Sequence, residues 1–219
     1  MISVIIPAYN AQRYIDQAIK SVQNQECGHD VETLVVDDGS TDRTADIAGR
    51  YAALLAQPHQ GSASARNAGL YHTKGEYVFF LDADDLLLPG AFHALLEAME
   101  QNAGVQAVFA QAADFVSPEL GAVSKNRLQP RQAPYFGCLP GCALLKKALF
   151  EQVGLFDRSL RTGETVDWLL RLKDLGLPTM QINRVTLKRR LHTLNTGVVM
   201  KQQEKDDYLA IIRKRVVKK

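Results

Sequence analysis

The sequence predicts an α/β fold in which a mostly parallel central sheet is flanked by helices. Three apolar runs that are typical of buried strands occupy residues 2–6, 31–36 and 77–81, and amphipathic helical patterns lie between them. A strand, a helix and a strand with this spacing imply parallel, right-handed crossovers. Each run ends in polar residues, and ligands of open α/β sheets bind beyond the carboxyl ends of the strands.

Local patterns of apolar and polar residues predict the individual strands and helices. Residues 2–6 are a β-branched run that Pro7 interrupts, as expected where a buried strand ends. Residues 12–25 place apolar side chains in the stripe of a helix that lies on a sheet. The further expected elements are a strand at 31–36, a helix capped by Ser40 or Thr41 that ends near Ala53, an edge strand at 54–57, a helix at 60–70, a strand at 77–81, a helix from Pro89 to Met99, a strand at 105–110, a helix at 144–153, a helix beginning near 164, a strand at 179–185 and a tail helix at 202–219.

The third strand ends in three carboxylates, Asp82, Asp84 and Asp85. Three carboxylates within four residues repel one another unless a cation or water lies among them. In an extended backbone Asp82 and Asp84 point to the same side, where they could share one hard divalent ion. The alternative is a solvated loop in which an Asp caps the following helix.

Two other polar strand exits, Tyr9-Asn10 and Asp37-Asp38, are expected to converge with these carboxylates on one crevice. The helix at 60–70 is entered through Gly61 and Ser62, which leaves amide groups free to face an anion. Turn residues alone would explain each exit singly, but not all three together.

Composition restricts the class of protein. The 219 residues are 46% hydrophobic, which suits one large domain or two intimately packed halves. A net charge of +2 argues against nucleic acid as the main partner. Cys27, Cys138 and Cys142 do not match a zinc site, so we expect reduced thiols in a cytoplasmic protein. Neither a signal-peptide pattern nor an apolar stretch of about 18 residues is present in the sequence.

Four segments stand in order over residues 3–89: SVIIPAYN, VVDDGSTDRT, QGSASARNAGL and GEYVFFLDADDLLLP. Together they resemble the nucleotide-sugar half of the family 2 glycosyltransferases of the GT-A fold. The resemblance implies a single domain of two abutting halves. Residues 1–104 would bind the nucleotide sugar, residues 105–200 would hold the acceptor and the catalytic base, and residues 201–219 would form a basic C-terminal helix or tail.

The resemblance also implies roles for individual residues. Pro7, Tyr9 and Asn10 would flank the base and ribose of a nucleotide-diphosphate sugar. Asp38 would accept a hydrogen bond from the base, and Arg66 would help line the pocket. The full implied nucleotide-sugar set is Pro7, Tyr9, Asn10, Asp37, Asp38, Arg66, Asp82, Ala83, Arg190 and His192.

The implied metal site contains Asp84 and Asp82. Asp84 would ligate Mn²⁺ or Mg²⁺ that bridges the diphosphate, and Asp82 would face the ribose or a metal-bound water. Hard oxygen ligands suit these ions. Asp85 is interpreted as a supporting or helix-capping group.

Residues 154–175, GLFDRSLRTGETVDWLLRLKDL, resemble a second region of the same family. The usual sequence there is Glu-Asp at the start of a helix, and the acidic group is the general base. In this chain Thr165 stands where the Asp is expected. Glu164 is then the nearest carboxylate and Asp167 the alternative; a helix N-terminus would keep either ionised. Otherwise Thr165 is the N-cap and both carboxylates only complement the helix dipole.

Residues 187–196, LKRRLHTLNT, form a compact basic cluster. Similarity to an Arg-x-His-x-x-Asn segment of the family suggests that Arg190, His192 and Asn195 close over the donor phosphates, and His192 is also a candidate metal ligand; a solvated basic loop is the alternative. The basic tail helix is compatible with peripheral docking on anionic lipid at the inner face of a membrane. A frayed, solvated C-terminus is the competing interpretation.

The resemblance therefore implies a metal-dependent, inverting glycosyltransferase. It would move a sugar from a nucleotide-diphosphate sugar, with a UDP-sugar favoured, to a hydroxyl of a carbohydrate or lipid-linked acceptor in polysaccharide, glycolipid or cell-envelope glycan synthesis. The metal would stabilise the departing diphosphate while Glu164 or Asp167 removes the acceptor proton. Thr165 motivates the alternative, a nucleotide-sugar-binding homologue without a competent base.

Overall fold

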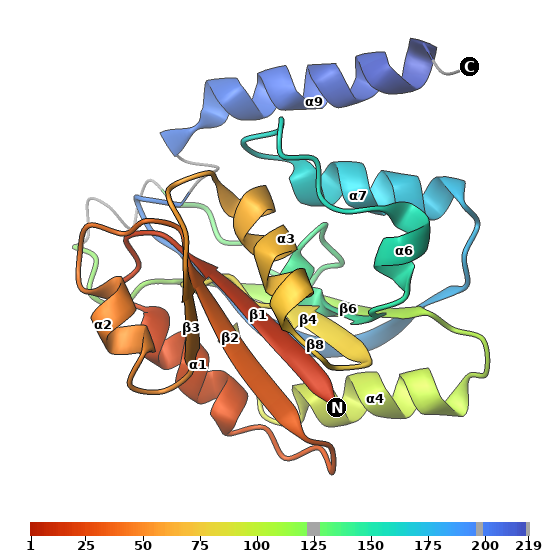
Figure 1. Ribbon diagram of the computed structural model, residues 1–219, viewed down its shortest axis with the longest axis horizontal. Coiled ribbons are helices and arrows are strands. Elements are labelled where there is room, and N and C mark those ends of the chain that lie inside the picture. Colours follow the sequence, from red (N-terminus) through yellow and green to blue (C-terminus); the bar gives the residue numbers. More distant parts are fainter. Residues whose placement is uncertain (122–127, 196–198, 218–219) are drawn as a thin grey trace.

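One mixed β-sheet with helices on both faces forms the fold (Figure 1). A computed structural model describes residues 1–121, 128–195 and 199–217. The strand order is β3-β2-β1-β4-β7-β6-β8-β5. The strands are β1 (Ile2–Ala8), β2 (Val31–Asp37), β3 (Ala53–Ala56), β4 (Tyr77–Phe80), β5 (Leu86–Leu87), β6 (Ala107–Val116), β7 (Ala143–Lys146) and β8 (Thr179–Leu191). The helices are α1 (Ile15–Gln23), α2 (Thr44–Ala48), α3 (Ser62–His72), α4 (Ala91–Gln101), α6 (Leu149–Val153), α7 (Glu164–Asp174) and α9 (Lys201–Val217), with a 3₁₀ turn at Pro140–Cys142.

The first four strands confirm the predicted parallel arrangement. Strand β1 pairs in parallel with both β2 and β4, and β2 pairs in parallel with β3. Ala8 lies opposite Asp37, and Ile5 lies opposite Phe80. The segments that follow β1, β2 and β4 therefore leave the sheet at the same edge, as expected from the sequence.

The helix predicted after β2 is shorter than expected and begins later. Neither Ser40 nor Thr41 caps it, because both bond to the exit of β1: the Ser40 hydroxyl accepts the Asn10 amide at 2.9 Å, and the Thr41 amide donates to Asn10 Oδ1 at 2.9 Å. The chain turns at Asp42, whose carboxylate accepts the Thr44 amide, and α2 covers only Thr44–Ala48. Two strand exits are thus joined directly.

The helix predicted over 144–153 is wrong in its first part. Residues 143–146 form β7, which runs antiparallel between β4 and β6, and only Leu149–Val153 is helical. Ala143, Leu144 and Leu145 are buried, and a short fully buried run can be helix or strand by its pattern alone. Strand β7 therefore runs opposite to both of its neighbours in the sheet.

Strand β8 is longer than the predicted 179–185 and extends to Leu191. It pairs in parallel with β6 along most of its length and in antiparallel fashion with β5. Since β5 follows directly after Asp85, this pairing brings residues 189–195 next to the carboxylates at the end of β4.

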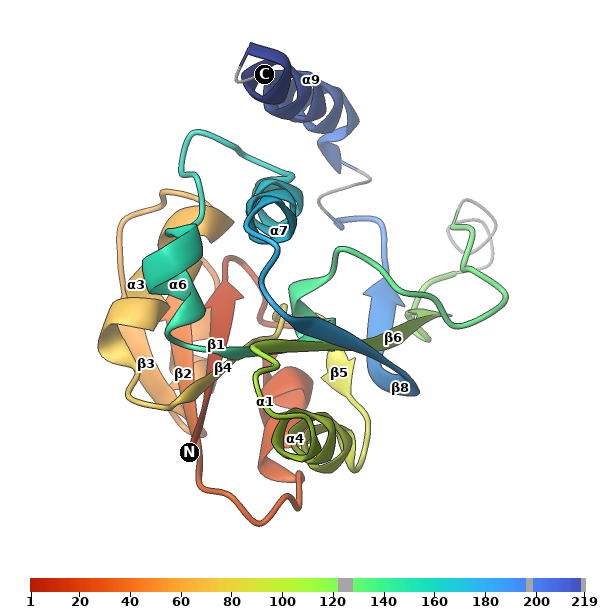
Figure 2. The same cartoon turned by 90° about the vertical axis from the view of Figure 1, so that its right-hand side faces the viewer.

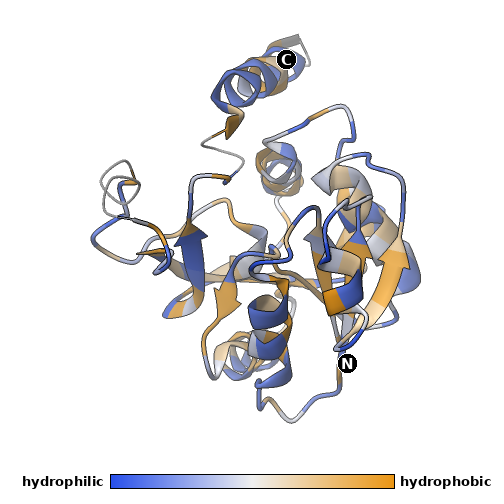
Figure 3. Cartoon of the chain, turned by 90° about the vertical axis from the view of Figure 1, so that its left-hand side faces the viewer, coloured by the Kyte–Doolittle hydropathy of each residue, from blue (hydrophilic) through white to orange (hydrophobic). Residues whose placement is uncertain are grey.

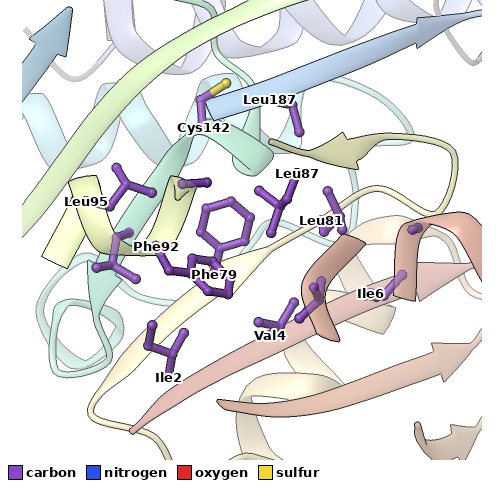
Figure 4. Close-up of a cluster of buried hydrophobic side chains, with 14 of the residues drawn as sticks. Ile2, Val4, Ile6, Phe79, Leu81, Leu87, Phe92, Leu95, Cys142 and Leu187 are labelled. Carbon is purple, nitrogen blue, oxygen red and sulfur yellow. The ribbon is translucent and has the colours of Figure 1, made fainter. Parts of the chain in front are cut away.

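Two hydrophobic cores hold the layers together. One core packs α1 and α4 on one face of the sheet, with Phe79 and Phe92 in edge-to-face contact at 5.2 Å between ring centroids (Figure 4). The other core packs α3, α6 and α7 on the opposite face (Figure 2), where Phe150 stacks on the buried Trp168. Gly69 lies directly against Ile5, where a Cβ would clash, so α3 can approach β1 closely.

Helix α9 confirms the expected tail helix and lies outside α7, away from the sheet (Figures 1 and 2). Apolar residues concentrate in the sheet, whereas α9 is coloured mostly hydrophilic with a few apolar positions (Figure 3). Within the described ranges, none of the helices combines the length and the hydropathy that crossing a bilayer would require.

Candidate functional site

A cleft of about 840 Å³ opens at the carboxyl ends of β1, β2 and β4. The start of α3, the start of α7, residues 189–195 and one side of α9 complete its walls. Eleven of the sequence-predicted site residues line it: Pro7, Tyr9, Asn10, Asp38, Arg66, Asp82, Ala83, Asp84, Glu164, His192 and Asn195. The structure therefore brings the two halves of the chain to one place.

Arg66 of α3 joins the end of β4 to the start of α7. Its guanidinium donates to Asp82 Oδ1 at 2.7 Å and to Glu164, which also accepts the Ser62 hydroxyl at 2.6 Å. Burial would lower the pKa of Arg66, but the charges of Asp82 and Glu164 outweigh that effect and raise it. Arg66 thus remains a cation between two carboxylates.

Helix α7 begins at Glu164, so Thr165 is not its N-cap. The preceding Gly163 has φ 72°, a left-handed conformation that glycine adopts without a Cβ penalty. The turn places Glu164 in the first helical turn, where the dipole favours a negative charge. Thr165 lines the cleft beside it and supplies a hydroxyl instead of a carboxylate.

Asp167 does not line the cleft. Its carboxylate lies 2.9 Å from Arg171 Nε, as the i, i+4 spacing predicts. Arg171 also donates to the carbonyl oxygens of Val153 and Leu155. Asp167 therefore orients Arg171, which bonds α7 to the backbone of residues 153–155. Of the two predicted bases, Glu164 alone reaches the cleft.

The backbone after β4 forms a turn, and the expected extended backbone is wrong. The Asp85 amide donates to the Asp82 carbonyl at 3.1 Å, so the three carboxylates take different partners. Asp82 pairs with Arg66, while Asp84 Oδ2 contacts His192 and Asn195. Burial, reinforced by the charge of Asp84, raises the pKa of both Asp82 and Asp85. A cation beside Asp84 would offset this crowding.

Asp84 fits a divalent ion better than His192 does. The His192 Nδ1 accepts the Leu194 amide at 3.2 Å, so Nε2 carries the proton and donates to Asp84 Oδ2 at 2.8 Å. His192 then orients the carboxylate, while Asp84 Oδ1 can face a hard cation. Within residues 1–121, 128–195 and 199–217 no group of three His, Cys, Asp or Glu side chains has ligand geometry.

From the sequence, Arg190 is expected to face the cleft, but Arg190 is not among the residues that line it. Its side chain is buried and donates to the Asp84 carbonyl and to Gln17, and its amide donates to Asp85 Oδ1, all at 2.8 Å. Residues 189–191 belong to β8, where successive side chains point to opposite faces. Arg189 therefore lines the cleft. Arg190 points to the other face of the strand and holds the turn of residues 82–85 through Asp84 and Asp85.

The β2 exit places Asp38 and Asp37 in different surroundings. Asp38 is buried, and its carboxylate contacts four donors: Gln57 Nε2, His59 Nδ1 and the amides of Gln60 and Gly61. The Asp38 carboxylate therefore orders residues 57–61, and few of its lone pairs are left to accept a hydrogen bond from a nucleobase. Asp37 lies outside the cleft lining; its Oδ2 accepts the Ser40 amide at 3.3 Å.

Several residues of the cleft have no clear signal in the sequence. His59 stacks on Tyr9 with ring centroids 4.1 Å apart, and Tyr14 contacts His192 at 4.9 Å between centroids. Glu204 and Tyr208 line the cleft from α9. Glu204 and Tyr208 could have been found only by knowing that the tail helix folds back over α7.

Residues 3–154 match the family model described as "Glycosyl transferase family 2". The chain is 31% identical over 212 residues to an uncharacterized glycosyltransferase of Rickettsia typhi, which covers 90% of this chain and 65% of that protein. A mannosyltransferase from Pyrobaculum calidifontis was solved in complex with GDP-Man and Mn²⁺. Its structure gives a TM-score of 0.71 at 19% identity, and the match covers 98% of this chain and 64% of the mannosyltransferase chain. Residues 1–349 of S. aureus TarS in complex with UDP-GlcNAc give a TM-score of 0.65 at 21% identity, covering 87% and 58%. The chain thus spans less than two thirds of each of these three proteins.

Proposed function

The chain belongs to glycosyl transferase family 2 and has the GT-A fold of a glycosyltransferase, and we propose that it moves a sugar from a nucleotide-diphosphate sugar to a hydroxyl acceptor. A UDP-sugar is the favoured donor, and a carbohydrate or lipid-linked group is the acceptor. The observation that carries the proposal is the arrangement of Asp82, Arg66, Glu164 and Asp84 around one cleft at the ends of parallel strands.

The donor is proposed to lie along the strand ends within residues 1–104. Its base would stack near Tyr9 and His59, whose rings already form an aromatic surface. Asp38 would act by holding residues 57–61 against the base. The sugar would lie between Ala83 and Arg66. Two proteins of this fold were solved in complex with UDP-GlcNAc and with GDP-Man, which supports a nucleotide sugar as the donor.

The diphosphate is proposed to lie near Asp84. Mn²⁺ or Mg²⁺, when bound, would supply positive charge that stabilises a diphosphate leaving group. Asp84 would hold this ion, His192 and Asn195 would orient the Asp84 carboxylate, and Arg190 would fix the turn that carries it. Arg189, which lines the cleft, adds a second cation on this side.

Transfer is proposed to invert the anomeric carbon in a single displacement. The acceptor oxygen would attack from the side of α7 and α9 while the bond to the diphosphate breaks. A carboxylate on that side must accept the acceptor proton. Glu164 reaches the cleft, where its carboxylate already accepts hydrogen bonds from Arg66 and Ser62.

A nucleotide-sugar-binding protein without transfer activity is the second candidate. Thr165 favours it, because a hydroxyl stands where the family usually has a carboxylate. Calorimetric titration of UDP-GlcNAc and GDP-mannose with Mn²⁺, followed by assays of nucleotide release, separates the two. Metal-dependent binding with acceptor-dependent nucleotide release supports the transferase; metal-dependent binding without release from any acceptor supports the binding protein.

Helix α9 is proposed to contact a membrane from the cytoplasmic side, consistent with a lipid-linked acceptor and a role in polysaccharide or cell-envelope glycan synthesis. Leu209, Ile212 and Val216 are exposed on its outer side, at 50%, 56% and 68%. Lys205 and Arg213 are exposed near them. Apolar side chains flanked by cations suit the interface of an anionic bilayer.

A further inference from the structure

Seven carboxylates line the cleft: Asp38, Asp42, Asp82, Asp84, Asp85, Glu164 and Glu204. The first six all accept hydrogen bonds from main-chain amides or from arginine, histidine or asparagine side chains. Across the described ranges, the Glu204 side chain has a single hydrogen-bond partner, the Tyr208 hydroxyl at 3.1 Å. Within the same ranges Asp82 and Asp85 also have one partner each, but these are the Arg66 guanidinium and the Arg190 amide. Glu204 is therefore the cleft carboxylate whose side chain is bonded only to a neutral hydroxyl.

Glu204 lines the cleft from α9, whereas Asp82 and Asp84 line it from the segment that follows β4. Its partner Tyr208 packs over Gly163, so that a Cβ on this glycine would lie 3.0 Å from the Tyr208 ring. Burial raises the pKa of the Tyr208 phenol, and the negative charges of Glu204 and Glu164 act in the same direction. Glu204 is thus close to the start of α7, where Thr165 replaces the expected carboxylate.

Asp207 fixes α9 in this position. Its buried carboxylate accepts the amides of Arg161 at 2.9 Å and Thr162 at 2.7 Å, together with the Thr162 hydroxyl at 3.1 Å. Ile211, one turn further along the helix, is 2% exposed. The helix that carries Glu204 is therefore anchored to the loop that leads into α7.

We propose that Glu204 accepts the proton of the acceptor hydroxyl during sugar transfer. The inference rests on the proposed function. As the acceptor oxygen forms its bond to the anomeric carbon, the bond from that carbon to the diphosphate oxygen breaks. The bonding electrons leave with the diphosphate, and the acceptor proton passes to the Glu204 carboxylate. Glu204 is partly exposed and returns the proton to water after the product leaves.

Glu164 is less suited to this step. Protonation of Glu164 would remove one of the two counter-charges of the buried Arg66, and an uncompensated buried charge is costly. The Thr165 hydroxyl has no basic lone pair of comparable strength at neutral pH. Glu204 can gain a proton without breaking an ion pair seen in the described chain.

The test measures UDP release from UDP-GlcNAc with Mn²⁺ and a panel of p-nitrophenyl glycosides as hydroxyl acceptors. We expect Glu204→Gln and Glu204→Ala to lower kcat by about 10²–10⁴-fold, with an unchanged Kd for UDP. Added sodium formate should restore part of the kcat of Glu204→Ala, because a small carboxylate can occupy the vacated space. Asp206→Asn, on the exposed side of the same helix, is the matched control and should behave as wild type.

Three results overturn the inference. Wild-type kcat in Glu204→Gln shows that another group takes the proton. Loss of kcat together with a weakened Kd for UDP, without rescue by formate, assigns Glu204 a structural role. If wild type binds UDP but releases none from UDP-GlcNAc, the proposed transfer itself fails and Glu204 has no proton to accept.

Discussion

The Arg66 guanidinium lies 2.7 Å from the Asp82 carboxylate and, with its other terminal nitrogen, donates to Glu164. Asp82 follows strand β4, two residues after its last residue, whereas Glu164 opens α7, 82 residues later in the chain. One buried cation therefore connects the proposed donor side of the cleft with the acceptor side.

Replacing Arg66 should destabilise the fold. Arg66→Met leaves Glu164 buried and Asp82 partly exposed without a counter-charge, which should lower the free energy of unfolding by about 3 kcal/mol, the lower end of the range for broken buried pairs because water screens Asp82. Adding Glu164→Gln should recover part of this loss. Urea unfolding monitored by the fluorescence of Trp168 measures both. Equal stability of Arg66→Met and wild type would contradict the interpretation of the pair.

Asp207 should couple α9 to the loop that leads into α7. Asp207→Ala removes the acceptor of three hydrogen bonds from residues 161–162, and we expect faster amide exchange at 161–163 with little change in UDP affinity. Hydrogen exchange with mass spectrometry measures this. Asp206→Ala on the exposed side is the control, and unchanged exchange at 161–163 in Asp207→Ala would show that α9 is not anchored there.

Acid should weaken the attachment of α9. Burial by itself would raise the pKa of Asp157, but hydrogen bonds from Lys214 and Ser159 outweigh it and lower the pKa to about 2. A carboxylate whose pKa is lower in the folded state contributes stability above its unfolded pKa of about 4 and loses it as the pH falls toward the folded value.

The difference in unfolding free energy between wild type and Asp157→Asn should therefore shrink by about 1 kcal/mol between pH 5 and pH 2, after allowance for solvent screening. Chemical unfolding at a series of pH values measures it. A difference that stays constant over this range would mean that the contact with Lys214 does not persist in solution.

The outer side of α9 should bind anionic vesicles. Replacing Leu209, Ile212 and Val216 by Ser removes the apolar contribution, and we expect sedimentation with phosphatidylglycerol vesicles to fall, with no change in UDP affinity. Arg213→Gln should weaken binding by about 1 kcal/mol and make it less sensitive to salt. Equal sedimentation of wild type and the triple variant would refute the membrane contact.

Much of the fold could be predicted from local pattern. Strands β1, β2 and β4 are rich in β-branched, aromatic and other apolar residues, and the stripes of α1 and α4 have a clear helical period, so the type of these elements followed from the sequence. Strand β7 could not be assigned in this way, because Ala143, Leu144 and Leu145 are buried on both faces and such a run fits helix and strand equally well. The short α2 depended on Ser40 and Thr41 bonding across to Asn10, a tertiary contact.

The site was predicted at the level of the strand ends and less well beyond them. Asp82, Asp84 and Arg66 follow recognisable motifs and do line the cleft. The burial of Arg190 depends on strand β8 continuing to Leu191, and the presence of Glu204 depends on the tail helix packing over α7. Such contacts between distant segments leave no local pattern in the sequence.

Calorimetric titration of UDP in the presence and absence of Mn²⁺ shows whether the strand ends gather around one nucleotide and its divalent ion. Wild type and the exposed control Asp46→Asn should bind UDP more tightly with Mn²⁺, and Asp84→Asn should lose this dependence on the metal. An unchanged, Mn²⁺-enhanced affinity in Asp84→Asn would rule out Asp84 as the residue that holds the ion.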